Sequence, residues 1–156
     1  MMELDVPGFK RLNLAHLVLD YNGTLALDGA LLPGVKRLIS DLAEVVEVHV
    51  LTADTHGRCG EHLAGLPVKI GILDRQPEDK AKRAYIEALG AESCAAVGNG
   101  MNDRLMLEAA ALGVAVIGQE CAAAWAVRKA DVIAPGVVAA LELFTKPLRI
   151  KATLRK

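Results

Sequence analysis

Four groups of polar residues stand at the ends of apolar runs, in an order that suits transfer of a phosphoryl group. They are Asp20-Tyr-Asn-Gly-Thr24, Thr52-Ala-Asp54, Pro77-Glu-Asp-Lys80 and Gly98-Asn-Gly-Met-Asn-Asp103. Transfer through a covalent intermediate needs a carboxylate nucleophile, cations for the phosphate oxygens and small hydrogen-bond donors around them. The four groups contain each of these residue types.

Each residue takes a definite role in this hypothesis. Asp20 is the predicted nucleophile, and Lys80 the cation that bridges it to the phosphate. Further contacts to the phosphate are expected from Thr52, Ala53 and Asn102. Oxygen ligands for Mg²⁺ are expected from Asp20, the backbone carbonyl of Asn22, Asn99 and Asp103.

Each group taken alone has a plainer interpretation. Asp20 with Asn22-Gly23 could be a strand followed by a turn, and Thr52 a strand-end cap. Lys80 alone would be a solvated helix lysine. The Gly98-x-Gly100 pair could belong to a dinucleotide loop, but the third glycine of that motif is absent. The order and strand-end placement of all four groups favour one shared site.

The elements that would position these groups alternate between strand-like and helix-like patterns. Strands are predicted at Ala15–Asp20, Val46–Thr52, Val68–Leu73, Cys94–Val97, Val114–Ile117 and Asp131–Ile133. Helices are predicted at Leu32–Glu44, His56–Leu63, Glu78–Leu89, Asp103–Leu112, Cys121–Arg128 and Val137–Phe144, with a small hairpin within Leu25–Leu32. This alternation predicts a three-layer α/β/α, Rossmann-like parallel sheet. Its active site should lie at the carboxyl edge.

Composition limits the class of protein. The chain has 156 residues, 53% hydrophobic and only 3% aromatic, and a net charge of −1. These values favour a single domain, residues 1–156, with an aliphatic core over about 14–145, and they give no sign of nucleic-acid or membrane binding. Residues 146–156 are basic and are predicted to be a solvated tail, the alternative being a docking arm for an anionic partner. Three widely spaced cysteines and the lack of a signal-peptide pattern predict a cytoplasmic protein.

The four groups together resemble the haloacid dehalogenase (HAD) superfamily. The likeness is to the phosphorylation domain of P-type ATPases and to small cap-less phosphatases, such as those acting on 3-deoxy-octulosonate 8-phosphate. The resemblance implies a HAD-like fold, Mg²⁺ as cofactor, an aspartyl phosphate at Asp20 and a small phosphorylated substrate. Residues 21–51 and 53–79 leave no room for a nucleotide-binding insertion or for a cap domain.

Two departures from the family pattern bear on the rate. Asn22 stands where HAD phosphatases carry the acid/base Asp, and an amide can neither protonate a leaving group nor activate water. Asn99 stands where a further Asp commonly binds Mg²⁺. Three hypotheses follow: a slow Mg²⁺-dependent phosphohydrolase, a catalytically weak phosphate- or protein-binding module, and a phosphotransferase with a persistent phosphoenzyme.

The remaining polar residues are given plainer roles. His16 and His49, inside strand patterns, are expected to be hydrogen-bonded sheet residues. His56, Cys59 and His62 recur every three residues, but their directions diverge on a helix, so a metal site there is disfavoured. Because an open, cap-less site favours cover by a neighbouring subunit, a homo-oligomer, dimer or tetramer, is predicted. Ala122–Val127 and Val137–Phe144 are the suggested contact faces.

Overall fold

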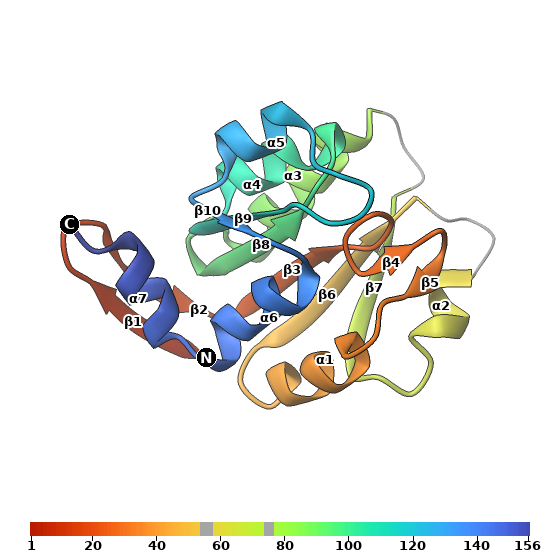
Figure 1. Ribbon diagram of the computed structural model, residues 1–156, viewed down its shortest axis with the longest axis horizontal. Helices are drawn as coiled ribbons and strands as arrows, with labels where there is room; N and C mark the ends of the chain where they lie inside the picture. Colours follow the sequence, from red (N-terminus) through yellow and green to blue (C-terminus); the bar gives the residue numbers. More distant parts are fainter. Residues whose placement is uncertain (54–57, 74–76) are drawn as a thin grey trace.

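A six-stranded parallel sheet forms the centre of the molecule. The computed structural model describes residues 1–53, 58–73 and 77–156. Its strands lie in the order β10-β9-β8-β3-β6-β7 (Figure 1). Their bounds are β3 His16–Asp20, β6 Glu47–Thr52, β7 Val68–Ile72, β8 Cys94–Gly98, β9 Leu112–Val116 and β10 Val132–Ala134. The predicted α/β/α fold class is confirmed.

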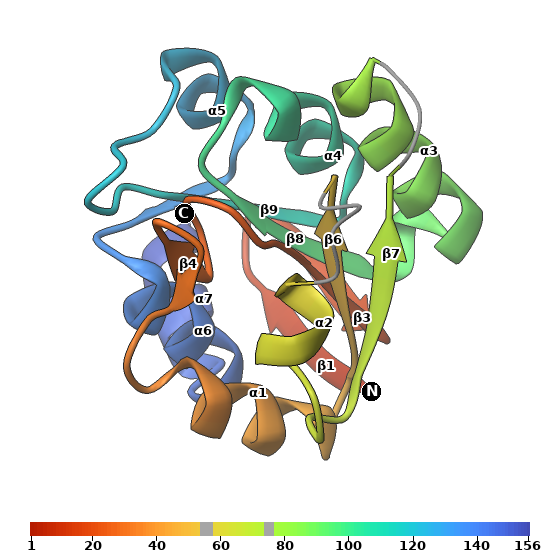
Figure 2. The same cartoon turned by 90° about the vertical axis from the view of Figure 1, so that its right-hand side faces the viewer.

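Helices cover both faces of the sheet, as Figure 2 shows. On one face lie α3 (Glu78–Leu89), α4 (Arg104–Ala109) and α5 (Ala124–Lys129). On the other lie α1 (Val35–Ala43), α2 (Arg58–His62) and α6 (Val137–Thr145). Two apolar clusters result, one on each side of the sheet. Because both faces are covered, the strands β8 and β9 are buried along their whole length, which explains their continuous apolar sequences.

The register between β3 and β6 sets the position of the polar groups. His16 pairs with Glu47 at the amino end, and Asp20 pairs with Leu51 at the carboxyl end. Thr52 follows Leu51 directly. The parallel pairing therefore brings the ends of the first two predicted strands to the same edge of the sheet.

The first helix begins later than its sequence pattern predicts. Instead of starting near Leu32, α1 starts at Val35, after Gly34 with a φ of 85°. This left-handed conformation favours glycine and turns the chain into the helix. The predicted hairpin is confirmed as the strands β4 (Ala26–Leu27) and β5 (Ala30–Leu31). No cap domain is present among the described residues that follow β3 and β6.

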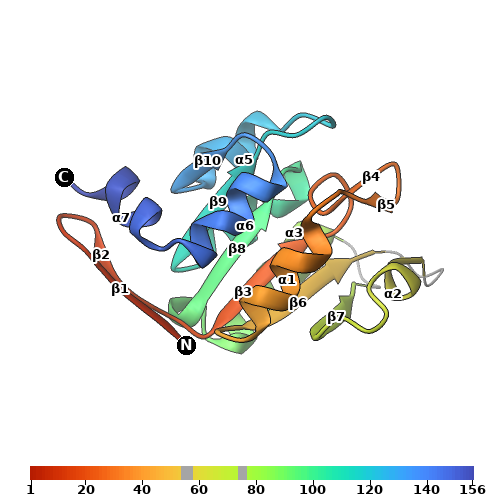
Figure 3. The same cartoon turned by 60° about the horizontal axis from the view of Figure 1, so that its bottom comes forward.

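Both ends of the chain differ from the prediction. The strands β1 (Met2–Val6) and β2 (Lys10–Leu14) form an antiparallel hairpin that precedes the first predicted strand. The segment predicted to be a solvated tail instead forms the helix α7 (Leu148–Leu154), which packs against β1 (Figures 1 and 3). Ile150 of this helix is completely buried, so apolar packing outweighs the basic character of the segment.

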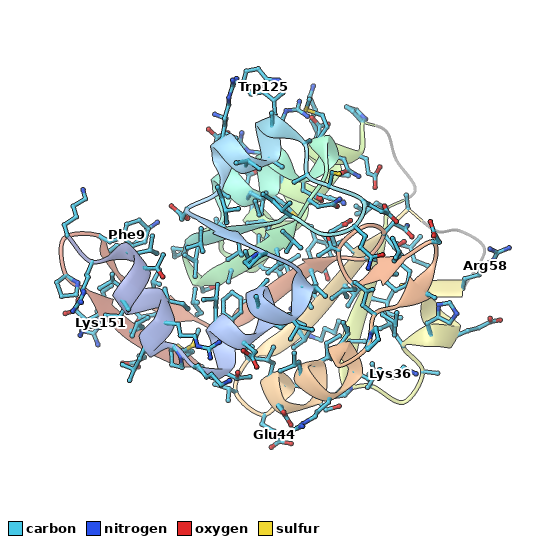
Figure 4. The ribbon with its side chains drawn as sticks, viewed as in Figure 1. Phe9, Lys36, Glu44, Arg58, Trp125 and Lys151 are labelled. Atoms are coloured by element: carbon cyan, nitrogen blue, oxygen red, sulfur yellow. The ribbon has the colours of Figure 1, made fainter. Side chains whose placement is uncertain are left out.

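The helix α6 also differs from its predicted role. Val137, Ala140, Leu141 and Phe144 are buried, and the helix packs against α1 within the molecule. These side chains are therefore part of the core and not a contact face for another subunit. On α5 the Trp125 side chain stands at the outer surface, 49% exposed (Figure 4). Across the described part of the chain, no helix combines the length and apolar character that a membrane span requires.

Candidate active site

A buried lysine joins two carboxylates at the carboxyl edge of the sheet. Lys82 Nζ lies 2.6 Å from Asp20 Oδ1 and 2.7 Å from Asp103 Oδ1. Asp20 ends β3, Asp103 follows β8, and Lys82 lies on α3. All three residues are at least nine-tenths buried. The predicted meeting of Asp20 and Asp103 is thus found, with one ammonium group between them.

The lysine in this position is Lys82 and not the predicted Lys80. The two residues lie two positions apart on α3, which separates their directions by about 200° around the helix axis. Lys80 is exposed, whereas Asp79, Lys82 and Ile86 form the buried face of the helix. Their spacing of three and four residues was the signal that could have identified Lys82 from the sequence.

Backbone donors hold the Asp103 carboxylate in place. Its Oδ2 atom accepts hydrogen bonds from the backbone N–H groups of Asn99, at 2.9 Å, and Gly100, at 2.8 Å. A Cβ atom added to Gly98 would lie 2.5 Å from Asp103 Cγ. Glycine at position 98 therefore allows the carboxylate to lie directly against the end of β8. Arg104 adds an ion pair to Asp79, at 2.6 Å, which connects α4 to the start of α3.

Thr24 and Asn99 complete the surroundings of the Asp20 carboxylate. The Thr24 hydroxyl donates to Asp20 Oδ2 at 2.9 Å and lies 3.2 Å from Asn99 Oδ1. Asn99 Nδ2 donates to the Cys121 carbonyl at 3.1 Å. The amide is therefore oriented with its oxygen toward the site, as a metal ligand would be.

Burial and charge shift the ionisation of the central pair. Burial, with the nearby Asp103 carboxylate, raises the pKa of Asp20 to about 7, although Lys82 and Thr24 act in the opposite direction. Burial alone would lower the pKa of Lys82, but the carboxylates of Asp20 and Asp103 outweigh it and raise that pKa. Lys82 is thus a permanent cation, and Asp20 holds its charge only with help from neighbouring positive groups.

The other predicted site residues lie around this centre. Thr52 is buried at the end of β6, and Ala53 is partly exposed beside it. Asn22 is exposed in the loop after Asp20, and Asn102 is partly exposed with its side-chain oxygen against Gly100. Asp54 of the second group and His56 lie outside the described residues. The structure therefore gathers the predicted groups at one edge, with Lys82 in place of Lys80.

An apolar pocket opens next to the site. It measures about 270 Å³ and is lined by residues that include Gly23, Thr24, Leu32 and Val137. Glu120 also lines it, and a Cβ atom on Gly23 would lie 2.8 Å from Glu120 Oε2. Sequence reasoning missed Glu120, because it lies in a loop that no motif marks. The pocket places a carboxylate and apolar walls beside the loop that carries Asn22.

The residues present fit a hard divalent cation. Asp20 and Asp103 are bridged by Lys82, so their Oδ1 atoms are at most 5.3 Å apart, the sum of 2.6 Å and 2.7 Å. The side-chain oxygen of Asn99 lies beside them. All of these candidate ligand atoms are oxygens, which Mg²⁺ prefers. A cation here would also offset the repulsion between the two buried carboxylates.

The fold is that of the haloacid dehalogenase superfamily. The cobalt-bound deoxy-D-mannose-octulosonate 8-phosphate phosphatase from Haemophilus influenzae superposes with a TM-score of 0.71 at 18% identity, over 90% of each chain. The 3-deoxy-D-manno-octulosonate 8-phosphate phosphatase from Moraxella catarrhalis, solved with magnesium, phosphate and the sugar, also gives 0.71. It is 16% identical and is matched over 91% of this chain and 90% of its own.

Sequence comparison places the chain in a narrower family. It is 38% identical over 87 residues to the uncharacterized protein MJ0073 of Methanocaldococcus jannaschii, covering 56% of this chain and 84% of that one. It is 46% identical over 39 residues to MJ0072 of the same organism, covering 25% and 89%. No family model matches the chain. The chain therefore belongs to the family of these two archaeal proteins.

Proposed function

We propose that this protein is a Mg²⁺-dependent phosphohydrolase that acts through an aspartyl phosphate on Asp20. The observation that carries the proposal is the buried triad in which Lys82 joins Asp20 and Asp103 at 2.6 Å and 2.7 Å. A structural ion pair would need only one carboxylate per lysine. Two buried carboxylates around one ammonium leave net negative charge, which suits a site that also holds a divalent cation.

The proposed reaction has two steps, phosphorylation of Asp20 and hydrolysis of the aspartyl phosphate. An Asp20 carboxylate oxygen forms a bond to phosphorus while the bond to the leaving oxygen breaks, and a water molecule then displaces Asp20 to release phosphate. Lys82 orients Asp20 and neutralises charge on the phosphate oxygens, and the Thr52 hydroxyl donates to one of them. When bound, Mg²⁺ would be held by Asp20, Asp103, Asn99 and the carbonyl of Asn22, and would stabilise the negative charge of the phosphoryl group.

Turnover should be slow because Asn22 stands where the resembling phosphatases carry the acid/base Asp. Its amide is too weak an acid to protonate the leaving oxygen and too weak a base to accept a proton from water. The leaving group must then be protonated by solvent, and an activated leaving group such as an aryl oxide needs this least. General acid–base help is worth about 10²–10⁴-fold where it is present.

A screen of aryl phosphates, sugar phosphates and nucleotides with Mg²⁺ tests the proposal. Asp20→Asn should lower kcat/KM by at least about 10⁴-fold, as removal of a catalytic nucleophile does in other hydrolases. Asp41→Asn is the matched control, because Asp41 is an exposed carboxylate on α1. Acid-quenched protein should carry phosphate on the peptide that contains Asp20. Equal activity in Asp20→Asn and Asp41→Asn would refute the mechanism.

A binding or regulatory module of the same fold is the second candidate, because Asn22 and Asn99 replace two acidic groups. That role predicts phosphate binding without turnover. Finding no activity on any substrate of the screen, with phosphate bound at the Lys82 site, would favour it.

The open site is the basis for two further proposals, a small phosphorylated substrate and a homo-oligomeric assembly. The pocket beside Thr24 has room for a small organic group, so a small phosphorylated substrate is proposed. A homo-oligomer could cover the pocket, and exposed Trp125 on α5 is the remaining candidate contact. Light scattering at tens of micromolar protein distinguishes a dimer or tetramer from a monomer.

A further inference from the structure

Two histidines and a glutamate converge at the opposite edge of the sheet. His16 Nδ1 lies 3.1 Å from His49 Nε2 and 3.1 Å from Glu47 Oε2, and His49 Nε2 lies 3.0 Å from the same oxygen. These three atoms form a nearly equilateral triangle. His16 begins β3, which places it about 13 Å along the strand from Asp20, so the cluster is separate from the candidate active site.

The sheet itself creates this convergence. His16 pairs directly with Glu47, and His49 follows Glu47 by two residues, so all three side chains project from the same face. Both strands lie inside the sheet and are fixed by their neighbours. Ligands carried on adjacent strands are positioned more firmly than ligands on loops.

Neighbouring groups orient two of the three side chains. His49 Nδ1 is hydrogen-bonded to the Tyr85 hydroxyl at 2.9 Å, which turns Nε2 toward the cluster. Lys69 pairs with Glu47 Oε1, which leaves Oε2 facing the two rings. Outer contacts of this kind, to the second nitrogen of a histidine and to the second oxygen of a carboxylate, are typical of metal sites.

Hydrogen bonds can pair each of the three atoms, but they do not use the close approach of the two rings. If both imidazoles donate to the carboxylate, their nitrogens lie 3.1 Å apart with no proton between them. A cation above the triangle satisfies all three atoms at once. Metal–ligand distances of about 2.0–2.1 Å and tetrahedral angles would put the ligand atoms about 3.3 Å apart, close to the separations observed.

We propose that His16, Glu47 and His49 bind a divalent transition-metal ion of the zinc type. Two imidazoles and one carboxylate favour Zn²⁺ or Co²⁺ over Mg²⁺, because imidazole is a poor ligand for Mg²⁺. The Glu47 side chain is 38% exposed, whereas that of His49 is only 1% exposed. The ion therefore has access from solvent on one side, and water would complete its coordination.

Titration of the untagged protein with Co²⁺ tests this site. Millimolar Mg²⁺ is kept present to occupy the oxygen ligands at the other edge, and a Cys121→Ser background removes the exposed thiol. We expect one equivalent of Co²⁺ with the visible absorption of a tetrahedral nitrogen–oxygen site. Zn²⁺ should displace it and raise the temperature of unfolding, because it binds the folded state.

Matched variants decide whether these three residues are the ligands. His16→Gln and Glu47→Gln should each weaken binding by about 100-fold or more, since even outer-shell changes cost about 10–100-fold. His62→Gln and Glu44→Gln are the controls. They remove another histidine and an exposed glutamate at the end of α1, which Figure 4 shows pointing outward.

Two results would overturn the proposal. One is the absence of Co²⁺ and Zn²⁺ binding at tens of micromolar metal in the Cys121→Ser protein. The other is binding of equal strength in Glu47→Gln and Glu44→Gln. Circular dichroism establishes that each variant is folded. If His16→Gln fails to fold, the half-exposed Glu47 position gives the decisive comparison.

Discussion

The two edges of the sheet carry opposite arrangements of charge, and one strand, β3, contributes a residue to each. At the carboxyl edge, two carboxylates surround one ammonium, and all three groups are buried. At the amino edge, two imidazoles face one carboxylate, which is partly open to water. Asp20 and His16 are the last and first residues of β3, and they belong to the two different clusters.

The difference shows how the surroundings decide the chemistry of a cluster. At the carboxyl edge, burial raises the pKa of Asp20, so the carboxylate depends on cations near it. At the amino edge, the hydrogen bond from Lys69 lowers the pKa of Glu47, and burial lowers that of His49. The first cluster suits a hard ion and a phosphoryl group, whereas the second offers two imidazole nitrogens beside one carboxylate.

Removal of Lys82 should disrupt the cluster of Asp20 and Asp103 at the carboxyl edge and leave the histidine cluster at the amino edge unaffected. Lys82→Met should lower kcat/KM by about 10³–10⁵-fold, the range for loss of a cation at a transferred phosphoryl group. Without Mg²⁺ it should also destabilise the fold by about 3–5 kcal/mol, because two buried carboxylates lose their partner. Activity assays and urea unfolding measure the two effects.

Lys80→Met is the control for this prediction, since Lys80 is exposed on the same helix. It should change stability by no more than about 0.5 kcal/mol. If both variants behave alike, Lys82 has no special role and the original assignment of Lys80 would deserve a second test.

Placing an acid at position 22 tests whether the missing acid/base limits turnover at the carboxyl edge. Asn22→Asp should raise kcat by up to about 10²–10⁴-fold on substrates with poor leaving groups, because a carboxyl group can protonate the leaving oxygen and then activate water. The gain in the phosphorylation step should be smaller for an aryl phosphate. Steady-state rates on both substrate types provide the measurement. If neither rate rises, another group already acts as the base, and Glu120→Gln becomes the variant to assay.

The parts of the site that follow from strand ends were accessible from the sequence. Asp20, Thr52 and Asp103 follow apolar runs, and parallel strands end at one edge, so their meeting required only the element order. Lys82 was missed because the inward direction of a helical residue depends on the phase of the buried face, which Asp79 and Ile86 define.

The amino-edge cluster required information that the sequence alone does not contain. His16 and His49 were correctly predicted to be hydrogen-bonded sheet residues. Their convergence with Glu47 depends on which strands are neighbours and in what register. The same holds for Ile150, whose burial depends on the position of the β1–β2 hairpin beside α7.

Replacing one carboxylate by an amide at each edge should change stability in opposite directions. In metal-free protein near pH 8, Asp20→Asn should stabilise the fold, because it removes a buried charge whose pKa is raised to about 7. Glu47→Gln should destabilise it slightly, because the pKa of Glu47 is lowered by its bond to Lys69.

The raised pKa of Asp20 also predicts how the stability of the fold changes with pH. A carboxyl group whose pKa is higher in the folded state stabilises the fold at low pH, and this contribution is lost as pH rises from about 4 to about 7. Wild-type protein in chelator should therefore lose stability over this interval more steeply than Asp20→Asn. Parallel curves in denaturant titrations at several pH values would contradict the raised pKa.

Adding a carboxylate at position 99 should have the smallest effect and should depend on metal. Asn99 Oδ1 faces the Thr24 hydroxyl beside Asp20, so Asn99→Asp would place a third negative oxygen near the predicted ion. Mg²⁺ affinity should rise by about tenfold, since affinity for hard cations follows the charge of the ligands. Without Mg²⁺ the variant should be less stable than wild type, because the Nδ2–H that donates to the Cys121 carbonyl is replaced by an oxygen. Calorimetry and thermal unfolding with and without Mg²⁺ measure both effects, with Asn13→Asp on the exposed part of β2 as control. Tighter Mg²⁺ binding by wild type than by Asn99→Asp would place the ion away from Asn99 and leave Asp20 and Asp103 as its side-chain ligands.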